Sequence, residues 1–235
     1  MARPVRTTLR FIGLLCALAA VAFALLHVYY GAMIWWWRDH APQETAFMSQ
    51  RMDELRAKQP KATLHYQFVP YTRIAASLKR AMIAAEDARF VDHEGFDWEG
   101  IQHAMDKNLK KGRVVAGGST ISQQLAKNLF LSGDRSYWRK GEEALITVML
   151  EAILDKRRIF EIYLNVIEWG TGVFGSEAAA RHYFGTSAAQ LDAEQAARLA
   201  AMTPNPRRYE RNPGSKVLAR RIPIIMAGMP SAELP

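Results

Sequence analysis

Residues 86–95 contain the first side chains that could do chemistry. Glu86 and Asp87 come at the C-terminal end of a predicted helix. The apolar face of that helix has spacings of three and four and consists of Ile74, Leu78, Ala81, Met82 and Ala85. Partial burial there would raise the proton affinity of a carboxylate and make it a usable general base or acid near neutral pH. Taken alone, an acid near Arg89 and His93 is more often a solvated or paired surface group, and His93 is expected to be a hydrogen-bonded structural residue.

A glycine-rich turn opens a second candidate segment, residues 117–128. Thr120 and Gln123 fit a capping box, so a helix is predicted to begin at this point and to run to about Leu131. Such a turn exposes backbone N–H groups and the positive end of a helix dipole, which can hold a pyrophosphate or a hydroxyl-rich ligand. One helix face would carry Thr120, Gln124, Lys127 and Asn128. A capped amphipathic helix without a ligand explains the pattern equally well, and the nucleotide P-loop pattern is absent from it.

A third candidate group combines Arg139 and Lys140 with Glu143. Arg139 and Glu143 are i, i+4 partners, and an exposed pair of this kind is the default interpretation. In a cleft, the two cations could instead bind phosphate oxygens, with Glu143 holding them or a metal ion.

Two further features give weaker signals. His93 and His103 match no common spacing of metal ligands. An acid-free basic stretch before the glycine-rich turn is predicted to be a mobile loop, which could meet lipid headgroups or phosphate; it consists of Lys107, Lys110, Lys111 and Arg113.

Helices are predicted to position most of these groups. Periodicity indicates a short helix at residues 45–58, a short strand at 64–68, a long helix at 137–154 and a helix at 188–201. The long helix has a predicted apolar stripe of Leu145, Val148, Met149, Ala152 and Ile153. A following stripe consists of Ile159, Ile162, Tyr163, Val166 and Ile167. The fold should therefore be mainly α.

Residues 11–37 contain no formally charged side chain, which predicts a transmembrane anchor. Arginines precede this run, at positions 3, 6 and 10, and tyrosines and tryptophans crowd its far end. The positive-inside rule and the aromatic belt then place the N-terminus in the cytoplasm and the rest of the chain across the membrane. A cleaved signal peptide is the alternative, but its apolar region is usually about 7–15 residues long and ends in small residues.

Composition limits the other possibilities. The 235 residues leave no room for two large catalytic domains, and a hydrophobic content of 49% excludes disorder along the whole chain. The single Cys16 excludes an intramolecular disulfide. Of the net charge of +8, three charges belong to the N-terminal arginines. The remaining +5 suits a membrane surface or an anionic ligand as well as a nucleic acid.

Taken in order, these segments resemble the family 51 peptidoglycan glycosyltransferases, most closely their monofunctional, membrane-anchored form. The first motif is carried by Glu86, Asp87, Phe90, His93 and Gly95. The second runs through residues 117–128, and the third consists of Arg139, Lys140 and Glu143. The fourth is carried by Lys156, Ile159, Glu161, Tyr163, Leu164, Asn165 and Gly170. The fifth is carried by residues 179–185 with Leu191, Glu194, Leu199 and Pro204.

The resemblance covers roughly residues 65–210, with two mild departures. Ser122 stands where the family usually has Thr, and Phe160 where it commonly has Leu. The sequence has no Ser-x-x-Lys, so the transpeptidase domain of the bifunctional relatives is not expected.

The resemblance implies a lysozyme-like helical head with a smaller membrane-proximal subdomain. It implies that lipid II is polymerised into β-1,4-linked glycan, with inversion at MurNAc C1 and release of undecaprenyl diphosphate. Glu86 would be the general base and Glu143 the second catalytic glutamate. Substrate contacts would come from Ser119, Thr120, Gln124, Lys127, Asn128, Arg139 and Lys140. No tightly bound cofactor is implied, although a divalent cation, Mg²⁺ or Mn²⁺, could assist.

The chain is accordingly expected to divide into a cytoplasmic tail (1–10), a transmembrane anchor (11–37), a juxtamembrane connector (38–62) and a glycosyltransferase domain (63–235). The expected location is the bacterial inner membrane, with the catalytic domain in the periplasm. Expected partners are lipid II, the growing glycan strand, membrane lipid and cell-wall synthesis proteins.

Three other functions compete with this interpretation. A lysozyme-like hydrolase or lytic transglycosylase would share the helical fold and a catalytic Glu but would cleave polymer. It leaves the anchor and the second and third motifs unexplained. A non-catalytic scaffold would use the charged clusters only to bind headgroups. A nucleic-acid binder does not fit a domain outside the cytoplasm.

Overall fold

The computed structural model describes residues 2–113, 117–131, 133 and 136–235, with side chains from residue 9 onward. The chain divides into two units, residues 1–40 and 41–235. The first unit is the helix α1 (Ala2–Trp36). Its 28-residue segment Leu9–Trp36 is long and apolar enough to cross a membrane. The sequence-based expectation of one N-terminal apolar helix is therefore confirmed.

Helices dominate the second unit, which confirms the mainly α prediction. The first five are α2 (Ala46–Arg56), α3 (Ala76–Glu86), α4 (Trp98–Lys111), α5 (Ile121–Phe130) and α6 (Tyr137–Ile153). The others are α7 (Lys156–Val166), α8 (Ser176–Phe184), α9 (Ala193–Met202), α10 (Pro206–Arg211) and α11 (Lys216–Gly228). Three short 3₁₀ turns are η1 (Tyr71–Arg73), η2 (Ala188–Gln190) and η3 (Met229–Ser231). This arrangement is consistent with a lysozyme-like helical fold.

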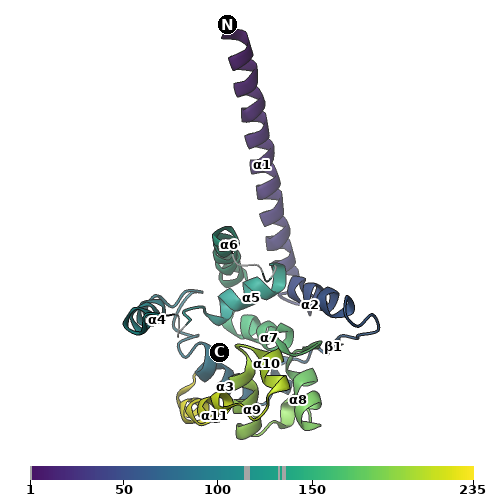
Figure 1. The fold of residues 1–235 in the computed structure, drawn as a ribbon, viewed down its shortest axis with the longest axis vertical. Helices are drawn as coiled ribbons and strands as arrows, with labels where there is room; N and C mark the ends of the chain where they lie inside the picture. Colours follow the sequence, from purple (N-terminus) through teal and green to yellow (C-terminus); the bar gives the residue numbers. More distant parts are fainter. Residues whose placement is uncertain (1, 114–116, 132, 134–135) are drawn as a thin grey trace. The chain divides into compact units, whose positions relative to one another are not determined.

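Two groups of helices form the core. In Figure 1, α5 lies between α6 and α7, and it also contacts α2. The second group consists of α3, α9 and α11, which pack on one another. The largest fully buried side chains are Trp169, Tyr163, Phe90, Phe160 and Phe174. The functional candidates lie where α3 ends beside α5.

A small sheet joins distant parts of the second unit. Its order is β1 (His65–Tyr66), β3 (Val173–Phe174) and β2 (Glu168–Gly170). β1 runs parallel to β3, and β2 runs antiparallel to β3. The predicted strand at 64–68 is thus present but shorter. Gly172 has φ +72°, a conformation that L side chains rarely adopt, and it allows the turn between β2 and β3.

The basic stretch predicted to be a loop is instead helical, because Lys107, Lys110 and Lys111 belong to α4. Asp97 caps this helix by accepting from the N–H of Gly100 at 2.9 Å, and Gly112 ends it with φ +61°. The charged side chains of this segment are exposed to solvent, and this run of charges was wrongly interpreted as a loop. Arg113 follows the helix, and residues 114–116 lie outside the described residues.

The bounds predicted for α6 are correct to one residue, but its predicted apolar stripe is wrong. Leu145 and Val148 are 45% and 56% exposed. The buried residues of this helix are Glu143, Ile146, Thr147 and Leu150. Its inward face therefore includes polar groups, and for that reason hydrophobicity alone selected the wrong face.

The single helix predicted at residues 188–201 is divided in the structure. The turn η2 comes first, and α9 begins after Asp192. Asp192 accepts from the N–H of Gln195 at 2.8 Å, and the Gln195 side chain accepts from the N–H of Asp192 at 3.2 Å. This capping box starts a new helix where periodicity alone predicted a continuous one.

Candidate active site

Glu86 is held by hydrogen bonds from two other parts of the chain. One carboxylate oxygen accepts from the Nε2 of Gln124 at 2.9 Å, and the other accepts from the hydroxyl of Thr203. Gln124 in turn accepts from the hydroxyl of Tyr163 at 3.0 Å. Burial raises the pKa of Tyr163 well above its ordinary value, and the charges of nearby carboxylates add to that effect, so the phenol remains a donor. The half-buried Glu86 carboxylate is thus held in one orientation.

Asp87 joins the end of α3 to the beginning of α5. Its buried carboxylate accepts from the backbone N–H of Ile121 at 2.9 Å and lies 3.0 Å from the Nε2 of His93. His93 is therefore a hydrogen-bonded structural residue, as predicted. Because Asp87 holds the first residue of α5, Gln124 lies one turn further on, within reach of Glu86.

The predicted capping box at the start of α5 is confirmed. The hydroxyl of Thr120 accepts from the N–H of Gln123 at 3.2 Å, and the Gln123 side chain accepts from the N–H of Thr120 at 3.0 Å. The Thr120 hydroxyl also donates to the carbonyl of Gly95 at 2.6 Å. Asn128 is buried as well, and its amide donates to the carbonyl of Gln124 at 2.7 Å. These bonds hold the glycine-rich turn and the polar face of α5 in place.

Glu143 forms ion pairs with two cations at the beginning of α6. It is only 3% exposed, and its carboxylate accepts from the Nη1 of Arg139 at 2.9 Å and from the ammonium of Lys140. The Lys140 ammonium also lies 3.4 Å from the hydroxyl of Ser119, on the turn before α5. The third motif is therefore a buried-carboxylate cluster and not an exposed surface pair.

Two neighbouring cavities meet at the pair formed by Glu86 and Gln124. The first, of about 260 Å³, is lined by residues 84–88, by residues 117–120, and by Asp97 and Gly100. The second, of about 320 Å³, is lined by Gln124, Lys127, Asn128 and Arg139 and by residues of α2, α7 and β2. Glu86 lines the first cavity and its partner Gln124 lines the second, so a carboxylate lies beside a cavity with cationic side chains in its wall.

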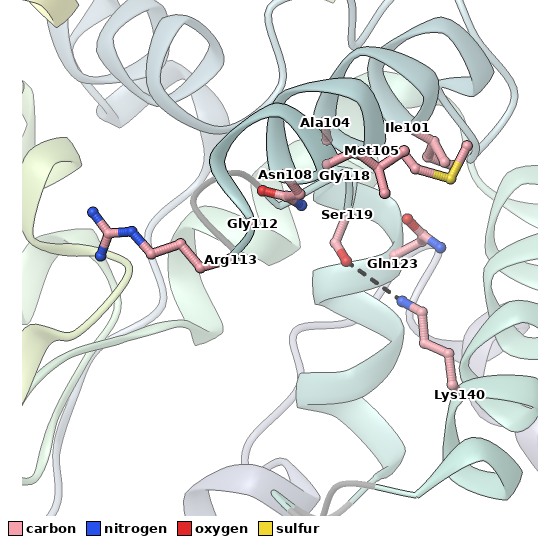
Figure 2. Close-up of a pocket in the computed structure, with 11 residues that line it drawn as sticks. Ile101, Ala104, Met105, Asn108, Gly112, Arg113, Gly118, Ser119, Gln123 and Lys140 are labelled. Atoms are coloured by element: carbon pink, nitrogen blue, oxygen red, sulfur yellow. Dashed lines mark hydrogen bonds between the residues drawn. The ribbon is translucent and has the colours of Figure 1, made fainter.

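A third, larger cavity of about 680 Å³ lies along α4. Figure 2 shows Ile101, Ala104 and Met105 on one side of it and the Ser119–Lys140 hydrogen bond on the other. It therefore combines an apolar wall with a cationic end. Ser119 lines both this cavity and the one beside Glu86.

Lys127 is a candidate for binding an anionic ligand. Burial lowers the pKa of its ammonium, the charges of Arg139 and Lys140 lower it further, and the charges of Glu143 and Glu86 oppose that shift. Within the described part of the chain, its ammonium has no hydrogen bond or ion pair to a carboxylate. A half-buried cation of this kind is well placed to bind phosphate oxygens.

No cluster for a metal ion is evident among the residues that the structure describes, since none of them forms a group of three or more His, Cys, Asp or Glu side chains suited to one. The carboxylate of Glu143, which the sequence suggested as a metal ligand, accepts from Arg139 and Lys140 on separate oxygens.

Comparisons with known proteins identify the family of this chain. Residues 52–230 match the family model described as transglycosylase. The chain is 66% identical over 203 residues to a biosynthetic peptidoglycan transglycosylase of Dechloromonas aromatica (strain RCB). The aligned region covers 86% of this chain and 87% of the relative. It is 60% identical over 222 residues to a protein of the same name from Chromobacterium violaceum, covering 94% and 97%. It is 56% identical over 231 residues to another from Azoarcus sp. (strain BH72), covering 98% and 99%.

These matches show a glycosyltransferase, and its structure places a carboxylate beside a cavity lined by cationic side chains. The chain belongs to the transglycosylase family, which confirms the resemblance drawn from its motifs.

The structure brings most of the predicted site residues together around α5 and the start of α6, and it adds two that sequence reasoning did not assign to Glu86. Thr203 was not singled out, although it directly precedes Pro204 of the fifth motif. Tyr163 was placed in an apolar stripe and in the fourth motif, and its hydroxyl proves to orient Gln124. Its place in the fourth motif and its polar hydroxyl were the signals available for Tyr163, but neither identifies Gln124 as its partner.

Proposed function

We propose that this protein polymerises lipid II into β-1,4-linked glycan strands and has no transpeptidase activity. The observation that carries the proposal is the position of the oriented Glu86 carboxylate beside a cavity with unneutralised positive charge. A reaction that uses a general base and releases a diphosphate needs a carboxylate and positive charge close together.

The proposed reaction is a single displacement. Glu86 takes the proton from the 4-hydroxyl of the acceptor GlcNAc as that oxygen attacks C1 of the donor MurNAc. The new bond joins the acceptor oxygen to C1, and the bond from C1 to the phosphate oxygen breaks. Its electron pair leaves with undecaprenyl diphosphate. Attack from the side opposite the leaving group inverts the configuration at C1.

Cations stabilise the negative charge that develops on the diphosphate. Lys127, Arg139 and Lys140 supply them in this proposal, and Glu143 orients Arg139 and Lys140 through its two ion pairs. Ser119, Thr120, Gln124 and Asn128 complete the substrate contacts, and Thr120 also holds the turn that carries Ser119. The proposal needs no tightly bound cofactor; a divalent cation would add positive charge at the diphosphate.

The anchor fits a substrate that carries a polyprenyl chain, because enzyme and substrate would share one membrane. We place residues 1–10 in the cytoplasm, residues 11–37 in the bacterial inner membrane, residues 38–62 in a connector and residues 63–235 in a periplasmic glycosyltransferase domain.

The test supplies purified full-length protein with lipid II in detergent micelles, with and without Mg²⁺ or Mn²⁺. A second reaction supplies preformed glycan. The proposal predicts polymer from lipid II and no cleavage of glycan. Cleavage without polymerisation would favour a hydrolase or lytic transglycosylase, and neither activity under any condition would favour a scaffold.

A further inference from the structure

The cavity that contains Lys127 has a wall from α2, a helix to which the sequence motifs assign no role. Phe47 and Arg51 of this helix line the cavity of about 320 Å³ together with Lys127 and Arg139. Both precede residues 52–230, the part that matches the transglycosylase family. Arg51 is thus a third cation that lines this cavity, beside Lys127 and Arg139 of the motifs.

Arg51 is held in place by several contacts. Its Nη1 donates to Glu54 at 2.8 Å, and its Nε lies 3.5 Å from the buried carboxylate of Glu168. The guanidinium lies 4.7 Å from the ring centroid of Phe47. Among the described residues, the buried Nε has no hydrogen-bond partner. The guanidinium is therefore held in place, and because its side chain is 30% exposed and lines the cavity, part of it remains open to an oxyanion.

Phe47 connects the two cations of the pocket. The Lys127 ammonium lies 5.9 Å from its ring centroid, compared with 4.7 Å for Arg51. An aromatic ring attracts cations through its quadrupole and so helps to hold two like charges near one cavity.

The cavity and its attached ion pairs carry an excess of positive charge. Its five cationic side chains are Arg51, Lys127, Arg139, Lys140 and Arg207. Its three carboxylates are Glu54, Glu143 and Glu168. Cations thus outnumber carboxylates around this cavity even when Glu86, bonded to Gln124 and Thr203 of its lining, is included, and an excess of positive charge suits the negatively charged oxygens of a diphosphate.

We propose that Arg51 binds a phosphate group of the polyprenyl diphosphate and that Phe47 positions it. The connector helix α2 would then form part of the donor pocket. The identity of the natural ligand rests on the proposed function; the existence of a diphosphate site with Arg51 in it does not.

The test measures binding of farnesyl diphosphate, a short polyprenyl diphosphate, to the full-length protein in detergent micelles by isothermal titration calorimetry. Arg51→Gln should weaken binding about tenfold or more, the loss expected for a hydrogen bond to a charged group. Arg51→Lys, which keeps the charge but loses the planar fork, should give an intermediate loss. Phe47→Leu should weaken binding about threefold.

Arg56→Gln is the matched control. Arg56 lies on the same helix, is exposed, and does not line the cavity, and the substitution removes the same charge. Its affinity for farnesyl diphosphate should equal that of the wild type. Equal affinities of Arg51→Gln and Arg56→Gln would overturn the inference, as would absence of binding by the wild type at millimolar ligand. If Arg51→Gln does not fold, Phe47→Leu decides, because it leaves the ion pairs intact; unchanged affinity would overturn the inference.

A lipid II polymerisation assay separates this inference from the proposed function. Wild-type protein that binds farnesyl diphosphate through Arg51 but forms no polymer would contradict the function and leave the site standing. Polymerisation by Arg51→Gln with the KM and kcat of the wild type would contradict the site alone.

Discussion

Replacing Glu143 with Gln removes the negative charge that holds two cations in place at the start of α6. The carboxylate is 3% exposed and forms ion pairs with Arg139 and Lys140. Removing one partner of a fully buried pair costs about 3–5 kcal/mol. Here the Arg139 and Lys140 side chains are 18% and 46% exposed, so water recovers part of that loss. The glutamine oxygen also keeps one hydrogen bond, which leaves an expected loss of about 1–2 kcal/mol in the free energy of unfolding.

Thermal unfolding and lipid II polymerisation measure the two consequences of Glu143→Gln. For a unit of this size, the expected loss lowers the Tm by about 2–8 °C. Polymerisation should fall about 100-fold, because misplaced cations no longer stabilise the leaving diphosphate.

Glu142→Gln is the control, since it removes the same charge from the neighbouring position, where no ion pair is found among the described residues. It should leave the Tm and the polymerisation rate close to those of the wild type. If Glu143→Gln behaved like this control in both assays, the reasoning about the buried cluster would be refuted.

Three other changes test separate parts of the site. Tyr163→Phe leaves Gln124 without its phenol donor and should lower kcat for polymerisation about tenfold with little change in Tm; an unchanged kcat would contradict an orienting role for Tyr163. Thr120→Ala removes the cap of α5 and should lower the free energy of unfolding by about 1–2 kcal/mol, measured by urea denaturation; a midpoint equal to that of the wild type would contradict it. Because burial lowers the pKa of Lys127, the affinity for farnesyl diphosphate should fall as the pH rises through that lowered pKa, and Lys127→Arg should bind independently of pH between about pH 7 and pH 10; a wild-type affinity that stays constant would contradict it.

Local signals in the sequence predicted part of the fold well. The capping box at Thr120 marked the start of α5, and periodicity marked the bounds of α6. The prediction of the buried face of α6 was wrong, because Glu143 and Thr147 lie inward while Leu145 and Val148 are exposed. Helix periodicity assumes that the inward face is the apolar one, and a polar site reverses that assumption.

The candidate site was predictable where its residues share one segment. The grouping of Arg139 and Lys140 with Glu143 follows from helical spacing alone. By contrast, the bond from Thr203 to Glu86 joins residues 117 positions apart, and no periodicity reports such a contact. Arg51 was missed for the same reason, because its role depends on Glu168 and on a cavity that only the folded chain forms.

The most direct test of the central claim is the initial rate of lipid II polymerisation by Glu86→Gln. The variant keeps the shape of the side chain and loses its ability to accept a proton. The account predicts a rate about 1,000-fold or more below that of the wild type, with unchanged affinity for farnesyl diphosphate. Glu94→Gln is the control. It neutralises an exposed carboxylate in the loop that follows α3 and should keep the full rate. Polymerisation by Glu86→Gln at the wild-type rate would contradict the assignment of Glu86 as the general base.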